Sequence, residues 1–196
     1  MDYKKVYESW LNNEFFDQDT RDELKNIEDD ENEIEDRFYQ ELAFGTAGLR
    51  GKLGAGTNRM NQYTVAKASQ AFADTISDMG EDAKKRVVTI CYDVRHKSDE
   101  FSKITAEVFA ANGIKVNIFK EIQPTPVCSY AIRKLKSIAG VMVTASHNPR
   151  EYNGYKAYGS DGSQILEDIA VQIQNYMKEY DDYSKIKRID FDKAMD

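Results

Sequence analysis

Apolar residues recur at helical spacing along the first forty positions of the chain. The first predicted helix carries its large apolar side chains on one face, at Tyr3, Val6, Tyr7 and Trp10. The same spacing returns after an acidic stretch, at Ile34, Phe38 and Leu42. We therefore expect a helical arm over residues 1–43 that packs on the rest of the protein.

The pattern then alternates between strands and helices. Apolar, β-branched runs predict strands over residues 86–92, 114–119 and 140–144, and a short strand over 155–158. Helical spacing predicts helices from Asn61 as N-cap to Gly80, from Ser98 as N-cap to Gly113, and over residues 128–135 and 165–177. This alternation is typical of an α/β protein, here a three-layer α/β/α domain with an open, mostly parallel (mixed) sheet.

The length of the chain favours one domain. At ~100–200 residues per domain, 196 residues make a single α/β/α unit, which we place at residues 44–185, with residues 186–196 as the start of a linker. Ligands of open α/β sheets bind at the carboxyl ends of the strands. The loops that follow the strands 86–92 and 140–144 are therefore the first candidates for a site.

Charge and composition narrow the partners. With 27 basic and 34 acidic residues the net charge is −7, which argues against duplex nucleic acid as a ligand. The acidic run 28–36 lacks the glycine and the spacing of a calcium loop, which favours a solvated helix face over a metal site. No apolar run approaches the ~20 residues of a membrane span, and no apolar signal segment follows Met1, so we expect a cytoplasmic protein without membrane contact. Cys91 and Cys128 form no CxxC motif and are expected to be buried free thiols.

A glycine-rich segment, GTAGLRGK at residues 45–52, invites comparison with a phosphate-binding P-loop. Five residues separate Gly45 from Gly51 where the motif has four, and Lys52 precedes Leu53 rather than Ser or Thr. The motif therefore fails. A glycine-rich loop that carries Arg50 and Lys52 still offers N–H groups and positive charge to a phosphate, and an ordinary tight turn explains the glycines equally well.

A second loop, TASHNP at residues 144–149, follows the predicted strand 140–144. Thr144 and Asn148 stand where a hydrolase nucleophile elbow needs glycines, so Ser146 is not such a nucleophile. A hydroxyl at this position can accept a phosphoryl group when a cation and a neighbouring Lys or Arg neutralise the transferring group. The alternative for Ser146 is a helix N-cap.

These segments together resemble the α-D-phosphohexomutase family. TASHNP followed by NGYK at residues 153–156 resembles the phosphoserine loop, and FGTAGLRG at 44–51 resembles the first active-site loop. YDVR at 92–95 with Ser98, and PTP at 124–126, match two further segments. GTNRMN at 56–61 and the helical arm resemble the phosphoglucomutase/phosphopentomutase branch. The match runs along the whole chain but covers only the family's first domain.

The resemblance assigns roles to these residues. It implies that Ser146 is the catalytic phosphoserine and supplies a Mg²⁺ ligand through its phosphate. It makes Lys156, with a pKa lowered by neighbouring cations, the general acid–base, and Arg50 a donor to phosphoryl oxygens. His147 would relay a proton or shape the loop. The residues expected at the substrate phosphate are Thr46, Gly48, Arg50, Arg95, Asn148 and Lys156. An ion pair between Asp93 and Arg95 would brace the loop.

The implied function is that of the phosphoserine-bearing domain of a Mg²⁺-dependent phosphoglucomutase. Such an enzyme interconverts glucose 1-phosphate and glucose 6-phosphate through glucose 1,6-bisphosphate. Domains II–IV of the family, which hold the metal loop, sugar recognition and a phosphate clamp, are absent here, so this fragment is expected to be inactive alone. Three alternatives stay open: a phosphopentomutase, a phosphomannomutase, and a non-catalytic module that binds a phosphosugar or a partner protein.

Overall fold

A five-stranded sheet forms the centre of the structure, a computed structural model that describes residues 2–195. Its strands run in the order β1-β5-β4-β2-β3. They are β1 (Leu49–Lys52), β2 (Val88–Tyr92), β3 (Val116–Ile118), β4 (Ala139–Val143) and β5 (Tyr152–Gly159). β4, β2 and β3 pair in parallel, whereas β5 is antiparallel to both β4 and β1. Only β5 therefore opposes the common strand direction, which confirms the predicted open, mixed sheet.

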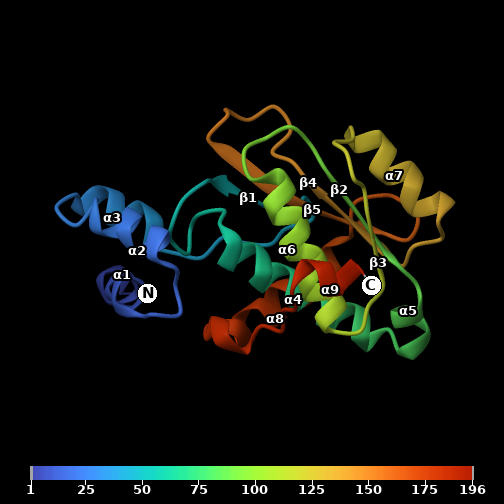
Figure 1. The fold of residues 1–196 in the computed structure, drawn as a ribbon, viewed down its shortest axis with the longest axis horizontal. Helices are drawn as coiled ribbons and strands as arrows, with labels where there is room; N and C mark the ends of the chain where they lie inside the picture. Colours follow the sequence, from blue (N-terminus) through green and yellow to red (C-terminus); the bar gives the residue numbers. More distant parts are fainter. Residues whose placement is uncertain (1, 196) are drawn as a thin grey trace.

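Helices cover both faces of this sheet, as the alternating pattern predicts (Figure 1). The body of the protein contains α4 (Gln62–Asp78), α5 (Glu81–Lys85), α6 (Ser98–Ala111), α7 (Thr125–Lys134), α8 (Glu167–Met177) and α9 (Phe191–Met195), with 3-10 turns η1 (Lys178–Tyr180) and η2 (Tyr183–Lys185). α4, α6 and α8 pack together on one face, and α7 packs on the other. No helix within residues 2–195 has the length and apolar character that a membrane crossing requires.

Strand side chains alternate between two cores. Toward α4 and α6 point the buried residues Val88, Ile90, Val141, Val143, Tyr155 and Ala157. Toward α7 point Cys91, Met142 and Tyr158, where they meet Cys128 and Ile132. Both cysteines are buried free thiols, as predicted. This alternation decides which face each polar strand residue occupies, because successive side chains of a strand point to opposite faces.

Several helix ends were predicted and others were not. Asn61 caps α4 with its side chain and forms a capping box with Thr64, and Gly80 follows the helix with φ +96°. Ser98, in contrast, is not the N-cap of α6: Lys97 takes that position, and the Ser98 hydroxyl donates to Asp93 instead. α7 begins at Thr125, three residues earlier than predicted, because Pro126 fits the first turn of a helix, where an N–H needs no partner.

The prediction of a loop for the whole glycine-rich segment was wrong for residues 49–52. These residues form β1, which pairs with β5 from Leu49 opposite Tyr155 to Lys52 opposite Tyr152. Four residues that include a glycine carry a weak strand signal, and the pairing with a segment a hundred positions away determines their conformation. The same pairing extends β5 beyond the predicted residues 155–158.

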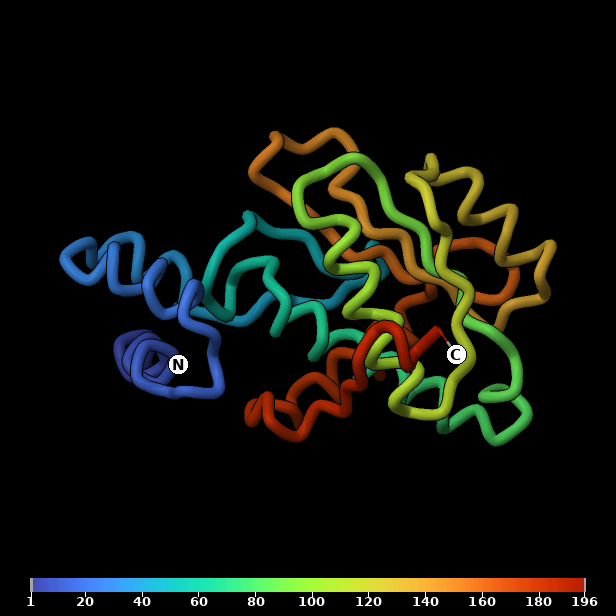
Figure 2. The backbone as a smooth tube through the Cα atoms, in the orientation of Figure 1, coloured from blue at the N-terminus to red at the C-terminus, as the bar shows by residue number. Residues whose placement is uncertain are grey.

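The arm consists of three short helices, α1 (Tyr3–Asn12), α2 (Gln18–Lys25) and α3 (Glu31–Phe38). They lie together at one end of the molecule (Figure 2). Trp10 stacks on Phe16 and meets Phe38, Tyr63 and Tyr183 edge to face, so α4 and η2 complete the arm's aromatic core. Part of the acidic run is also used: Glu33 and Asp36 bind Arg37 and Arg59, which corrects the picture of a fully solvated helix face.

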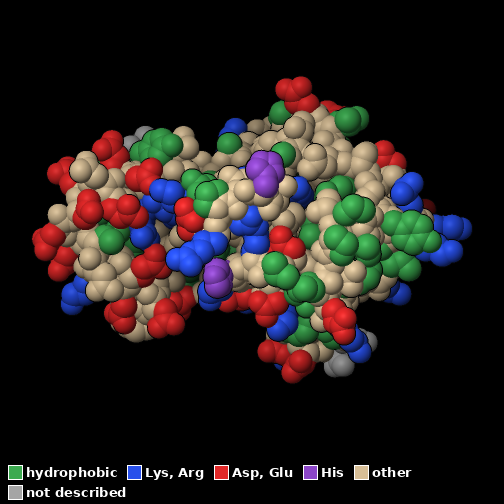
Figure 3. All heavy atoms as spheres, turned by 90° about the horizontal axis from the view of Figure 1, so that it is seen from above, with side chains coloured by type: hydrophobic (Ala, Val, Ile, Leu, Met, Phe, Trp, Pro, Cys, Tyr) green, Lys and Arg blue, Asp and Glu red, His purple; other side chains and the backbone are tan. Residues whose placement is uncertain are grey.

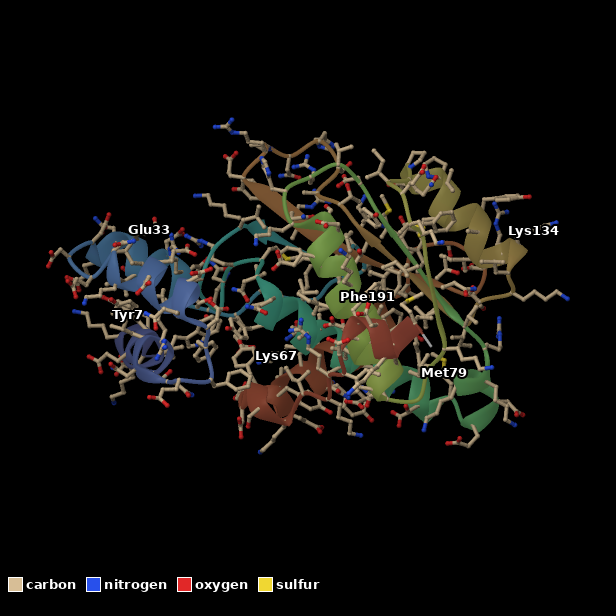
Figure 4. All side chains as sticks on the ribbon, in the orientation of Figure 1. Tyr7, Glu33, Lys67, Met79, Lys134 and Phe191 are labelled. Atoms are coloured by element: carbon tan, nitrogen blue, oxygen red, sulfur yellow. The ribbon has the colours of Figure 1, made fainter. Side chains whose placement is uncertain are left out.

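Buried charge ties the carboxyl-terminal segment to the body. Lys67 of α4 is 1% exposed and binds Glu41 at 2.8 Å and Asp181 at 3.1 Å. Arg188 pairs with Glu107 of α6, and the ammonium group of Lys103, also of α6, lies over the ring of Phe191 of α9. Phe191 is labelled in Figure 4. Residues 186–195 therefore lie against α4 and α6; residue 196 of the predicted linker lies outside the described residues.

Candidate active site

Two loops leave the sheet side by side at its carboxyl edge, which is uppermost in Figure 1. β2 ends at Tyr92 and β4 ends at Val143, and these two residues are partners in the parallel register. Residues 93–97 follow the first strand and residues 144–151 follow the second. The predicted site residues of both loops therefore meet at the edge where open α/β sheets bind their ligands.

Ser146 lies exposed on the second loop. Its backbone has φ +57°, a left-handed conformation that few residues other than glycine adopt. Its N–H donates to Thr144 Oγ1 at 2.9 Å, and its hydroxyl lies 3.3 Å from His147 Nδ1. The side chain is not an N-cap, since no helix follows it. A loop that holds an exposed hydroxyl in a strained conformation is typical of a reactive site.

Arg50 brings the glycine-rich segment to this loop. It stands on β1 opposite Gly154 of β5, and its Nη1 donates to Asn148 Oδ1 at 2.8 Å. The side chain is exposed, so its other donors face solvent. The structure thus brings the predicted residue Arg50 to Ser146 and Asn148, which lie almost a hundred positions further along the sequence.

Lys156 lies on the same face of the sheet as Arg50. It is half-buried on β5, opposite Met142 of β4 and two residues from Gly154. Burial lowers the pKa of its ammonium group, the charge of Arg50 lowers it further, and Asp93 opposes the shift. A lowered pKa was expected from neighbouring cations; the larger cause here is desolvation. A lysine of this kind releases its proton more readily than an exposed one.

The lowered pKa of Lys156 predicts how the stability of the folded chain depends on pH. The folded chain binds the Lys156 proton less tightly than the unfolded chain, so protonated Lys156 costs stability at pH 7, and the cost fades as the pH rises towards 10.5, the ordinary lysine value. We expect Lys156→Met to unfold at the same or a higher temperature than the wild type at pH 7, with a gain below about 1 kcal/mol because solvent screens a half-exposed charge. The gain should shrink near pH 10. Thermal unfolding at both pH values tests this, with the exposed Lys52→Met as control; a clear loss of stability at pH 7 would contradict it.

Gly48 and Thr46 belong to a tight turn before β1. The N–H and C=O groups of Gly45 and Gly48 bond to one another at 3.1 and 2.7 Å, which leaves Thr46 exposed at the tip. Gly48 has φ +80°, and a Cβ atom there would stand 1.8 Å from the Tyr155 carbonyl oxygen. The glycine is therefore required by the close approach of two backbones. Phosphate binding by Thr46 and Gly48 stays a prediction.

Arg95 has four partners in addition to the predicted Asp93. Its guanidinium donates to backbone carbonyl oxygens of the Ser146 loop, and its Nε lies 3.8 Å from Asp93 Oδ2. The predicted Asp93–Arg95 pair is therefore present, but it is long, and the loop carbonyls are the closer contacts.

Asn153 is a further residue of this edge, and in the sequence it appears only as part of the NGYK motif. It is fully buried at the start of β5. Its Nδ2 donates to the His96 carbonyl at 2.9 Å and to Ser98 Oγ at 3.1 Å, and its Oδ1 accepts from the Gly154 N–H at 2.7 Å. It ties the start of β5 to the loop after β2. The available signal was an amide side chain followed by glycine inside a strand with three tyrosines.

The two loops border a shallow cavity of about 370 Å³, lined by Asp93, Val94, Arg95, His96, Ser146, Asn148 and Arg150. Seen from above, this side of the molecule carries histidine side chains among a group of Lys and Arg side chains, although the chain is acidic overall (Figure 3). A larger cavity of about 500 Å³ lies between the arm and α6, but Asp17, Asp19 and Glu23 line it and would repel a phosphate. Positive charge favours the smaller cavity for an anionic ligand.

The residues of this site do not make a metal centre on their own. Within residues 2–195 no group of three or more His, Cys, Asp or Glu side chains is placed to hold a metal ion. Mg²⁺ takes oxygen ligands, commonly one or two carboxylates together with phosphate oxygens. Asp93, the one carboxylate among the lining residues of the cavity, already accepts hydrogen bonds from the Arg95 N–H and the Ser98 hydroxyl. The described part of the chain therefore offers Mg²⁺ no complete set of protein ligands, and a phosphate on Ser146 would add one oxygen ligand.

Comparison with known proteins identifies the family of this chain. Residues 41–184 match the family described as phosphoglucomutase/phosphomannomutase, alpha/beta/alpha domain I. A phosphoglucomutase of Staphylococcus haemolyticus (strain JCSC1435) is 42% identical over 143 residues, 73% of this chain and 26% of that protein. A phosphoglucomutase of Staphylococcus aureus (strain USA300) is 40% identical over 161 residues, 81% of this chain and 29% of that protein.

Solved structures share the fold. A putative phosphomannomutase from Thermus thermophilus superposes with a TM-score of 0.64 at 30% identity, over 70% of this chain and 30% of that one. The Paramecium protein pp63/parafusin, a phosphoglucomutase in its open form, gives a TM-score of 0.60 at 25% identity, over 76% of this chain and 27% of that one.

The fold and the two loops define an α/β/α domain with a cationic edge around an exposed serine. The chain belongs to the phosphoglucomutase/phosphomannomutase family and corresponds to domain I of its members. It spans between a quarter and a third of the length of the relatives named above.

Proposed function

We propose that this chain is the phosphoserine-bearing domain of a phosphoglucomutase and that Ser146 carries the transferred phosphoryl group. The proposal rests on one observation above all. Ser146 stands exposed in a strained backbone conformation beside His147, in a loop that Arg50 contacts through Asn148. An exposed hydroxyl near fixed cations is what phosphoryl transfer requires, because this chemistry depends on positioning and charge neutralisation.

The reaction divides into two transfers of opposite direction. In the first, the Oγ–P bond of phospho-Ser146 breaks, a new O–P bond forms on a free hydroxyl of the sugar monophosphate, and the hydroxyl proton passes to neutral Lys156. In the second, the other phosphate of the bisphosphate moves to Ser146 Oγ, and Lys156 returns the proton to the sugar oxygen. The lowered pKa of Lys156 favours this proton exchange relative to an ordinary lysine.

Arg50 and His147 have supporting roles in this proposal. The planar donors of Arg50 suit the oxygens of a phosphoryl group better than a lysine would. His147 Nδ1, 3.3 Å from Ser146 Oγ, hydrogen-bonds the hydroxyl when Ser146 is unphosphorylated. Mg²⁺, when bound, neutralises charge on the transferring phosphoryl group, and its remaining ligands would come from outside this chain.

The sugar is proposed to be glucose, because the staphylococcal relatives are named phosphoglucomutases. A phosphomannomutase and a phosphopentomutase are the alternatives within the same chemistry, with the Thermus relative bearing the first of these names. We also propose that residues 1–196 alone are inactive, since they span only part of their relatives and offer Mg²⁺ too few ligands.

The test is a substrate comparison on the native polypeptide purified from its source cells. It is assayed with glucose 1-phosphate, mannose 1-phosphate and ribose 1-phosphate at matched concentrations, with glucose 1,6-bisphosphate and Mg²⁺ present. The proposal predicts the highest kcat/KM for glucose 1-phosphate. Preference for another sugar would move the assignment to that branch, and no turnover of any of the three would favour a non-catalytic binding module.

A further inference from the structure

We propose that Arg95 is a positioning residue that holds Ser146 in place for phosphoryl transfer, and that it does not bind the phosphate itself. The inference rests on the proposed function of Ser146. It goes beyond that function because it names the part of the chain that keeps the reactive loop in its strained conformation.

The Ser146 loop has little support of its own. Ser146, His147, Pro149 and Arg150 are exposed. Three hydrogen bonds form within residues 144–152: from the Ser146 N–H to Thr144 Oγ1 at 2.9 Å, from the Asn148 N–H to the Ala145 carbonyl at 3.1 Å, and from the Tyr152 N–H to the Pro149 carbonyl at 3.0 Å. A positive φ at a serine persists only when the surroundings enforce it. Something outside the loop must therefore hold it.

Arg95 supplies that support through four hydrogen bonds. Its Nη1 donates to the carbonyl oxygens of Pro149 at 2.9 Å and Tyr152 at 3.0 Å. Its Nη2 donates to those of Ser146 at 2.7 Å and Asn148 at 2.6 Å. The two Nη atoms carry four hydrogens in total, and these four acceptors use all of them. The fifth donor, Nε–H, lies on the Asp93 side at 3.8 Å from Oδ2, so the two Nη groups that face the Ser146 loop have no hydrogen left for a phosphate.

Arg95 is itself held in place by residues of the loop after β2 and of β5. Its side chain is only 13% exposed. Asp93 Oδ1 accepts from the Arg95 N–H at 3.0 Å and from Ser98 Oγ at 2.9 Å, and Asn153 donates to the same serine. The backbone of Arg95 is therefore held by a partly buried network, and its guanidinium links the loop after β2 to the loop after β4.

The contact with the Ser146 carbonyl connects these four hydrogen bonds, which we call the Arg95 clamp, to phosphoryl transfer. Nη2 holds the Ser146 carbonyl, and a fixed carbonyl together with φ +57° sets the direction of the Cα–Cβ bond that carries Oγ. In-line transfer requires the reacting oxygen to be held within about 0.5 Å of its productive position. Losing the clamp would release Ser146 while the neighbouring cations stay where they are.

The charge-conserving variant Arg95→Lys separates the possibilities. A lysine keeps the positive charge but lacks the planar fork that reaches four acceptors. The matched control is Arg86→Lys, because Arg86 also donates to loop carbonyls, those of Lys136 at 3.0 Å and Ser137 at 2.8 Å, at the opposite end of β2. Each chain is prepared with serine and with phosphoserine introduced at position 146 during translation, so the result does not depend on whether the native protein is phosphorylated.

Two readouts are compared. Amide hydrogen exchange at Asn148 and Tyr152 of the serine form reports the loop, and ³¹P NMR titration of the phosphoserine form reports the phosphate. In Arg95→Lys we expect both amides to exchange at least about tenfold faster, since charge-assisted hydrogen bonds are lost. We also expect the phosphate titration to move towards that of free phosphoserine, near pH 6. Arg86→Lys should change neither.

Two results would overturn the proposal. Unchanged amide exchange with a shifted phosphate titration would make Arg95 a direct phosphate ligand. Faster amide exchange with an unchanged titration would make it a structural brace without influence on position 146. Failure of the proposed function shows itself separately, as absence of phosphate on native Ser146.

Discussion

The Ser146→Ala variant of the native enzyme should contain no phosphate in its active-site peptide and should lose at least about a thousandfold in kcat. Removing the group that forms the covalent intermediate leaves only binding and electrostatic stabilisation to catalyse the reaction, and losses of this size or larger follow when a nucleophile is removed. Coupled spectrophotometric turnover and peptide mass analysis measure the two quantities.

This variant should fold normally. Ser146 is exposed, and serine and alanine both carry a Cβ atom, so the strain at φ +57° is similar for the two. Ser160→Ala, an exposed serine beyond the end of β5, is the matched control and should keep both phosphate and turnover. Retained activity in Ser146→Ala would place the phosphoryl acceptor elsewhere and remove the basis for the roles of Lys156 and Arg50.

Gly48→Ala should destabilise the chain by about 3 kcal/mol or more. A non-glycine residue in the left-handed region costs about 1–2 kcal/mol. The new Cβ would also stand 1.8 Å from the Tyr155 carbonyl oxygen, which is backbone within a paired strand and has no room to move. Overpacking of this kind costs a further ~1–3 kcal/mol. The midpoint of urea denaturation measures the loss.

Gly45→Ala is the control at the other end of the same turn. Its φ is not positive, and a Cβ there would have no atom within 4 Å. We expect its stability to lie within about 1 kcal/mol of the wild type, because surface substitutions away from such features have small effects. Equal stability of the two variants would mean that β1 does not pair with β5 in the register described.

Local sequence signals predicted much of this fold. β4 is an apolar run buried on both faces. α4 has a capping side chain at Asn61 and a terminating glycine at Gly80. Both elements can therefore be predicted from residues within or directly beside them. β1 carries no such signal, because its strand conformation depends on β5. The capping assignment of Ser98 failed for a related reason: its hydroxyl is taken by Asp93 and Asn153, one of which lies 55 positions away.

In the candidate site, too, some features were predictable from local motifs and others depend on contacts between distant segments. Ser146, Arg50 and Asn148 were identified from their motifs, and the structure brings the loops that carry them together. The partners of Arg95 are four backbone carbonyl oxygens. Every residue has a carbonyl oxygen, so the residue types in the sequence do not predict these contacts. The pKa shift of Lys156 was expected in direction, but its main cause, burial beside β4, depends on strand order.

The most direct test of the central claim is peptide mass analysis of the native protein isolated from its own cells, with phosphatase inhibitors present throughout. Our account predicts one phosphoryl group, located on Ser146 within the peptide that contains TASHNP. An unmodified Ser146 in protein that is otherwise active, or a phosphoryl group on a different residue, would contradict the account and with it the catalytic roles assigned to this edge of the sheet.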